Sequence, residues 1–121
     1  MGIAAAAALA TGVPAKAQLA ESNVTPTRPA NIQAVLLEEG YRAKLGTDSV
    51  GDPMITSATA GYDFDILFYD CTDHQECGSI QFFNRFTKPD NGSLEAVNDW
   101  NAKKRYTSAY RAENGDMVLT M

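Results

Sequence analysis

Apolar and polar residues alternate most clearly between positions 62 and 86, and this pattern predicts two neighbouring strands. In residues 62–69 every second position, starting at 62, is aromatic or aliphatic, and two of the intervening positions are aspartates. This period of two is typical of a strand with one buried face. Residues 79–86 repeat the pattern less cleanly, because Phe83 falls on the nominally wet side. The stretch 71–77 is too polar for a core, so we predict a β-hairpin with this stretch as its loop. The positions that alternate on the buried side are Phe64, Ile66, Phe68, Ile80, Phe82 and Asn84.

The residues before this hairpin predict one helix and two strands. Pro29 suits the first turn of a helix and Gly40 suits its C-terminal cap. Alternation then predicts a strand at 41–45 and another at 54–59, separated by a loop at 46–53 that is dense in turn-forming residues. One stripe of the helix should face a core. The apolar residues at helical spacing in this stripe are Ile32, Val35 and Leu36.

The residues after the hairpin predict a second helix and a second hairpin. Apolar residues at helical spacing indicate a helix from Leu94 to about Lys104, which we expect to lie across the sheet. Alternation predicts strands at 106–110 and 117–121, joined by an Asn-Gly turn. The predicted fold is therefore α+β, with an antiparallel sheet and two helices packed on it.

The first residues predict a segment that is separate from this domain. A short alanine-rich apolar run is followed by Ala15-Lys16-Ala17, which has small residues at the two positions that a signal peptidase reads. We predict a signal peptide at residues 1–17, truncated at its start because no basic segment precedes the apolar run. Residues 18–28 are predicted to be a flexible leader, and residues 29–121 to be the domain. The alternative for the first segment is an alanine-rich helix or tail.

Composition and charge narrow the classes of function. The 121 residues are 45% hydrophobic and 21% charged, as in an ordinary globular domain. The net charge of -5 argues against a nucleic-acid partner, because phosphates require a basic surface. The apolar run near the start is too short to span a membrane. Two cysteines and an export signal together predict one disulfide, between Cys71 and Cys77, in a periplasmic or secreted protein.

Two clusters of residues are candidates for chemistry. Cys71, His74 and Cys77 could be metal ligands, but their spacing fits no common zinc module, so we predict a disulfide and no metal. Asn98 and Asn101 flank Trp100, and we expect these amides to bond to the backbone ends of neighbouring strands rather than to line a ligand pocket. The sequence contains no cofactor-binding or catalytic motif that we recognise, so we predict no cofactor and no catalytic residue.

Several separate stretches, in order, resemble the YbjN family, whose members are labelled bacterial sensory transduction regulators. The resemblance covers roughly residues 32–121. It implies a fold like that of type III secretion chaperones and no catalytic activity. Family members continue past the last strand into a further helix, and we expect this C-terminal helix to be missing here, or replaced by a partner or a second copy. The stretches that carry the resemblance are residues 40–48, 51–55, 64–71, 79–82 and 98–106.

We therefore expect a non-enzymatic, exported binding or regulatory domain that associates with a protein partner or with itself as a homodimer. The alternative, from a different class, is a small metal-binding or hydrolytic module built on the loop from Cys71 to Cys77.

Overall fold

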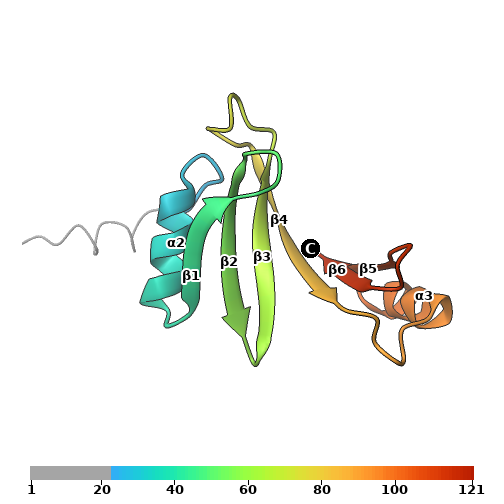
Figure 1. The fold of residues 1–121 in the computed structure, drawn as a ribbon. Coiled ribbons are helices and arrows are strands. Elements are labelled where there is room, and N and C mark those ends of the chain that lie inside the picture. Colours follow the sequence, from blue (N-terminus) through green and yellow to red (C-terminus); the bar gives the residue numbers. More distant parts are fainter. Residues whose placement is uncertain (1–22) are drawn as a thin grey trace, which may run out of the picture.

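The computed structural model describes residues 23–121, and the predicted signal peptide and the first part of the leader lie outside the described residues. Two helices and six strands follow one another along the described chain (Figure 1). The order of elements confirms the prediction of an α+β fold. The elements are α2 (Pro29–Glu38), β1 (Arg42–Thr47), β2 (Pro53–Thr59), β3 (Tyr62–Tyr69), β4 (Ser79–Phe86), α3 (Leu94–Lys103), β5 (Ser108–Arg111) and β6 (Met117–Thr120).

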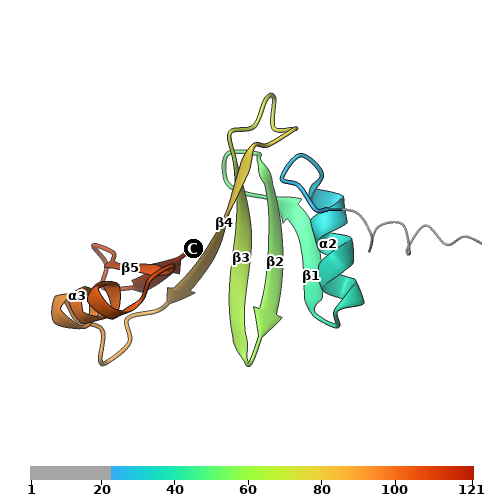
Figure 2. The same cartoon turned by 180° about the vertical axis from the view of Figure 1, so that it is seen from behind.

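The six strands form one sheet in the order β1-β2-β3-β4-β6-β5, and every neighbouring pair is antiparallel. The sheet is a meander from β1 to β4, and the second hairpin then joins through its last strand. Figures 1 and 2 show α2 beside β1 at one end of the sheet and α3 beside β5 at the other. The edge strands are therefore β1 and β5, and a helix accompanies each.

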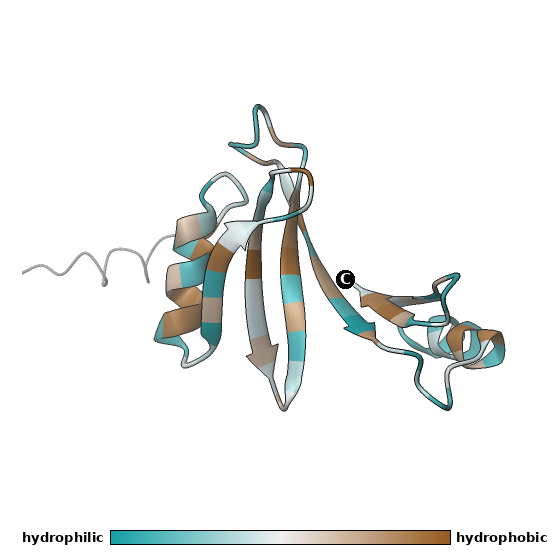
Figure 3. Cartoon of the chain, in the orientation of Figure 1, coloured by the Kyte–Doolittle hydropathy of each residue, from teal (hydrophilic) through white to brown (hydrophobic). Residues whose placement is uncertain are grey.

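Helix α2 packs its apolar stripe onto the β1–β2–β3 end of the sheet. Proline in its first turn presets the backbone, and Gly40, at φ +90°, reverses the chain into β1. Ile32 is buried, and Leu36 packs against the same core. Figure 3 shows hydrophobic residues on α2 and midway along β2 and β3. The fully buried core residues beneath the helix are Ile55, Ile66, Phe68 and Cys77.

Strand β4 changes partner near its middle. Its first half pairs with β3 from the Tyr69–Ser79 pair to the Asp65–Phe83 pair. Its second half pairs with β6, from Phe83 opposite Thr120 to Phe86 opposite Met117. Figure 1 shows β4 running away from β3 toward β6. The start of β3 therefore has no paired neighbour on its β4 side, and the sheet opens between β3 and the second half of β4.

Helix α3 does not lie across the sheet as predicted. It contacts β5, at the edge of the sheet, and none of its residues is fully buried. Ser93 caps its first turn by accepting a hydrogen bond from the backbone N–H of Ala96, at 3.0 Å. The helix takes the edge position because its polar side chains bond to the β5 backbone, which a helix over the middle of the sheet could not reach.

The limits and faces of several strands also differ from the prediction. Gly46, Thr47 and Pro53 belong to strands rather than to the predicted loop, because β1 and β2 stay paired as far as Thr47 and Pro53. Tyr106 lies outside β5. In β6 the alternating apolar residues Met117, Leu119 and Met121 predict the apolar face, but the fully buried side chain is Val118, which neighbouring strands flank on both sides.

Candidate functional site

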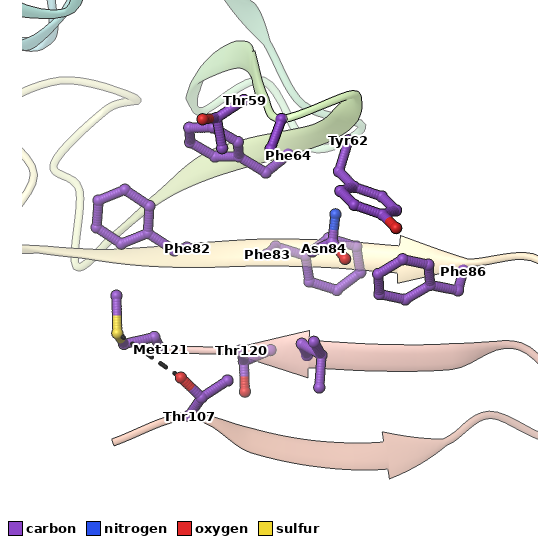
Figure 4. A pocket seen from close by; sticks show the side chains of 12 residues that line it. Thr59, Tyr62, Phe64, Phe82, Phe83, Asn84, Phe86, Thr107, Thr120 and Met121 are labelled. Carbon is purple, nitrogen blue, oxygen red and sulfur yellow. Dashed lines mark hydrogen bonds between the residues drawn. The ribbon is translucent and has the colours of Figure 1, made fainter. Parts of the chain in front are cut away.

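An aromatic groove lies where β4 separates from β3. It has a volume of about 400 Å³, and Figure 4 shows aromatic rings from both strands around it. It also receives residues from the β2–β3 turn and from the end of the chain. None of its twelve lining residues has a charged side chain. They are Thr59, Ala60, Tyr62, Phe64, Phe82, Phe83, Asn84, Phe86, Thr107, Leu119, Thr120 and Met121.

The aromatic wall follows from the strand period. Phe64 shares a strand face with Ile66, and Phe82 lies opposite Ile66 on β4, so Phe64 and Phe82 point to one side of the sheet. Their ring centroids are 6.0 Å apart. Tyr62 and Phe86 meet edge to face at 5.7 Å. Tyr62 remains 58% exposed, so part of this aromatic surface faces water.

Two polar side chains of the groove make contacts within the fold. The Asn84 side-chain amide donates to the backbone carbonyl of Asp63, beyond the point where β3–β4 pairing has ended. The side chain therefore bridges the opening that the diverging strands leave. Thr107 Oγ1 lies 3.9 Å from the Met121 sulfur at the other side of the groove (Figure 4). The groove offers apolar contact rather than reactive groups.

A second hollow, of about 530 Å³, adjoins the groove beside α3. Tyr62, Phe86 and Leu119 line both hollows. Val97 and Trp100 of α3 contribute to its far wall. Helix α3 thus borders the second hollow, and the shared residues make the two hollows neighbours.

The structure places the two cysteines as a disulfide at the end of the first hairpin. Their sulfurs are 2.05 Å apart, and Cys77 is fully buried in the core beneath α2. His74 projects from the same loop, and its Nδ1 lies 2.8 Å from Asp52 Oδ1 in the β1–β2 loop. Among residues 23–121, no three His, Cys, Asp or Glu side chains are grouped as metal ligands. The disulfide and the contact between His74 and Asp52 thus both hold the loop.

Trp100 bonds to the backbone just before β5, and Asn101 bonds to the backbone of β5 itself. The Trp100 indole N–H donates to the carbonyl of Thr107 at 3.1 Å. The Asn101 amide donates to the carbonyl of Ala109 at 3.0 Å, and its oxygen accepts from the Ala109 N–H at 2.8 Å. Asn101 therefore occupies the position that a further strand would take beside β5. Asn98 is exposed, so the three predicted residues do not converge on one site.

A charged network joins β4 to the second hairpin. Asp116 is 7% exposed, and its carboxylate accepts from Arg85 Nε at 2.8 Å and from the Lys88 backbone N–H at 3.1 Å. Asn114 donates to the same carboxylate at 3.0 Å. The hydrogen bond from Arg85, and next that from Asn114, hold the pKa of Asp116 below its usual value. The network thus ties the C-terminal end of β4 to the turn before β6.

Sequence reasoning identified the aromatic face but missed the groove. The signal that could have revealed it is the irregular alternation at Phe83 and Asn84, since a polar residue on an aromatic face needs a partner. Thr107 and Leu119 reach the groove only through the pairing of β6 with β4. No local pattern marks them.

A family model described as "Putative bacterial sensory transduction regulator", YbjN, matches residues 28–121. The chain belongs to the YbjN family. This assignment confirms the resemblance inferred from the sequence, and the description of the family is bacterial and regulatory. Comparison with curated proteins and with solved structures found no match. The likeness to type III secretion chaperones therefore stays a prediction.

The length and composition of the helices in this YbjN chain bear on whether a helix could span a membrane. Within residues 23–121, neither helix is long and apolar enough to cross a membrane.

Proposed function

We propose that this YbjN chain is a non-enzymatic regulatory binding domain that associates with a protein, either a partner or a second copy, through the groove and the adjoining hollow. The observation that carries the proposal is the open, uncharged, aromatic surface between the two helices. The family's regulatory description supports the same class of function.

Aromatic residues without charge are typical of the centre of protein interfaces. Contact between apolar surface and water is unfavourable in free energy. Covering this surface with another apolar surface is therefore favourable, by about 25 cal/mol for each Å² removed from water. Tyr62, at 58% exposed, remains accessible to an incoming chain. Contiguous apolar surface of this kind on a domain marks an interaction site.

The alternative of a hydrolytic or metal-binding module has little support. His74 is the only histidine of the sequence, and it lies on an exposed loop at the end of the sheet where the disulfide is found. Both cysteine sulfurs are joined, which removes the thiolate that a nucleophile or metal ligand would need. The groove itself holds no titratable acid or base apart from the Tyr62 phenol.

We further propose that the protein works in the periplasm or outside the cell. The disulfide supports this location, because such bonds persist in oxidising compartments. Fractionation of bacteria that express the whole chain, with immediate alkylation of free thiols, tests it. We expect the protein in the periplasmic or secreted fraction with both cysteines protected from alkylation. Recovery from the cytoplasm with two reactive thiols would contradict the location.

Crosslinking in living bacteria tests the binding function. A photo-crosslinking aromatic amino acid placed at Tyr62 should give covalent adducts on illumination, because the position lies on the open surface. The matched control is Tyr41, which is also an exposed tyrosine, at 44%, but precedes β1 at the opposite end of the sheet. Adducts at 62 and not at 41 support the proposal. Equal yields at both positions, or none at 62, would refute it.

A further inference from the structure

Resting on the function proposed above, we propose that the domain consists of two bodies that turn relative to each other about β4, and that this motion controls access to the groove. The first body comprises residues 29–82 and the second comprises residues 84–121, with Phe83 at the junction. The proposal rests on the separate packing of the two bodies, on the strand that they share and on the contacts that cross the opening between them.

The two bodies bury their apolar side chains separately. The hydrophobic core beneath α2 includes Ile80 and Phe82 of β4 but no residue after them. Ala109 and Val118 of the second body are buried outside this core. Helix α2 contacts β1 and β2, and helix α3 contacts β5, so no helix within residues 23–121 spans the junction. Neither helix therefore fixes the angle between the two bodies.

Strand β4 belongs to both bodies. At Phe83 it is paired on both sides, with Asp65 of β3 and with Thr120 of β6. Beyond Phe83 it stays paired with β6 but no longer with β3. The two strands therefore diverge from Phe83, which makes this residue the pivot. Past the pivot, β3 and β4 can change their angle without breaking a hydrogen bond of the ladder between them.

The groove lies between the two bodies. Of its twelve lining residues, five belong to the first body, six belong to the second and Phe83 lies at the junction. Tyr62 and Phe64 of the first body lie across the groove from Phe86 of the second (Figure 4). Because each body supplies part of the wall, the angle between the bodies sets the width of the groove. Sites between two bodies commonly open and close by a hinge motion.

Two side-chain contacts across the opening hold the observed angle, and we call them the latch. The Asn84 side-chain amide donates to the backbone carbonyl of Asp63. Tyr62 meets Phe86 edge to face, with ring centroids 5.7 Å apart. Tyr62 is 58% exposed, so water can replace the ring contact. A single side-chain hydrogen bond and one exposed ring contact stabilise an arrangement only modestly, so the latch permits opening.

Distances between nitroxide labels, measured by pulsed EPR, test the motion. Lys44→Cys on β1 and Glu113→Cys in the turn between β5 and β6 place one label on each body, at exposed positions. The native cysteines are joined to each other and do not react with the label. Asn84→Asp keeps the shape of the side chain but cannot donate to the Asp63 carbonyl. It should raise the population at a second distance at least about fivefold relative to the first.

The matched control changes an amide within one body. Gln33 also donates its side-chain amide to a backbone carbonyl, that of Ala43, but both residues lie in the first body. Gln33→Glu is the equivalent change of amide to carboxylate and should leave the distances as they are in the wild type. A second latch variant, Tyr62→Leu, removes the ring contact and should also raise the population at the second distance. Circular dichroism should show all three variants folded.

Access to the groove is tested with the crosslinker at position 62. If the latch restricts access, Asn84→Asp should increase the yield of adducts at this position about fivefold, and Gln33→Glu should not. Equal yields in the two variants would overturn the control of access.

The possible outcomes separate this inference from the function on which it rests. One narrow distance that neither Asn84→Asp nor Tyr62→Leu alters overturns the motion. If position 62 still gives specific adducts in that case, the binding function stands and the groove is a fixed surface. If position 62 gives no specific adduct in any variant, the function falls as well.

Discussion

The two ends of the sheet protect their edges in the same way but are stabilised differently. At β1, Gln33 of α2 donates its side-chain amide to the carbonyl of Ala43 at 3.1 Å. At β5, Asn101 of α3 bonds to both backbone groups of Ala109. Each helix thus places an amide where a foreign strand would pair, which limits edge-to-edge association.

The energetic basis of the two helix contacts differs. Helix α2 inserts Ile32, which is only 7% exposed, into a core of fully buried side chains. Helix α3 buries no residue fully and is held by the polar bonds of Trp100 and Asn101, with Lys104 Nζ 5.3 Å from the centre of the Trp100 ring. The α2 end is therefore a hydrophobic core, and the α3 end is a polar attachment beside an open apolar surface. We expect substitutions at the α2 end to have the larger effects on stability.

The largest effect should come from the core at the α2 end. Phe68 is fully buried, so Phe68→Ala should lower the free energy of unfolding by about 3–5 kcal/mol. The neighbouring Tyr69 is 44% exposed, and Tyr69→Ala should change it by less than about 1 kcal/mol. Chemical denaturation measures both. Similar losses for the two variants would contradict a core confined to one side of β3.

Loss of the disulfide should have the second largest effect on stability. The bond between Cys71 and Cys77 closes a loop with a sequence separation of six, and loop-closure entropy then gives about 2 kcal/mol of stabilisation. Reduction of the wild-type chain should lower the denaturation midpoint accordingly. The double variant Cys71→Ala with Cys77→Ala is the control, because its midpoint should not respond to reductant. An unchanged wild-type midpoint would mean that the crosslink contributes nothing at this end.

The side-chain hydrogen bonds that hold α3 to β5 should contribute less to stability than the disulfide. Asn101→Leu keeps the side-chain size but leaves the N–H and C=O of Ala109 without their partner, at a cost of about 1 kcal/mol. Asn98→Leu is the matched control, because Asn98 is exposed on the same helix. Hydrogen exchange should show faster opening of α3 and β5 in Asn101→Leu, with the amides of β2 and β3 unaffected. Loss of protection across the whole sheet would show that the two ends are not separable.

The smallest effect should be a pH dependence at the α3 end. The hydrogen bond from Arg85 leads the interactions that lower the pKa of Asp116, so the folded carboxyl ionises more readily than the unfolded one. Its stabilising contribution is complete above the unfolded pKa of about 3.9, and it is lost as pH falls through the lower folded value. We expect the wild type to lose more stability than Asp116→Asn on acidification below about pH 4, measured by thermal unfolding.

Asp90 provides the control for this titration, because it is exposed in the loop before α3. Asp90→Asn should keep the acid sensitivity of the wild type. If Asp116→Asn and the wild type respond identically to acid, the ion pair between Arg85 and Asp116 does not link β4 to the second hairpin.

The sequence by itself determined the order of the elements and the apolar face of β3 and of the first half of β4. A period of two placed Phe64, Phe68 and Phe82 on one side of the sheet, and the confirmed α+β class followed from the order of the elements. These properties are local, because backbone geometry alone fixes which neighbouring side chains share a face. The family resemblance could also be read from short stretches in order.

Only the tertiary structure decided where the groove lies and what borders it. The change of partner at Phe83 depends on β6, more than thirty positions later in the chain, and the contact between Arg85 and Asp116 spans 31 positions. The edge position of α3 likewise depends on backbone groups of β5 that no helical period can reveal. Strand order and helix docking depend on which distant segments can bury their apolar surfaces and pair their backbone groups with one another. A local sequence pattern does not contain this information.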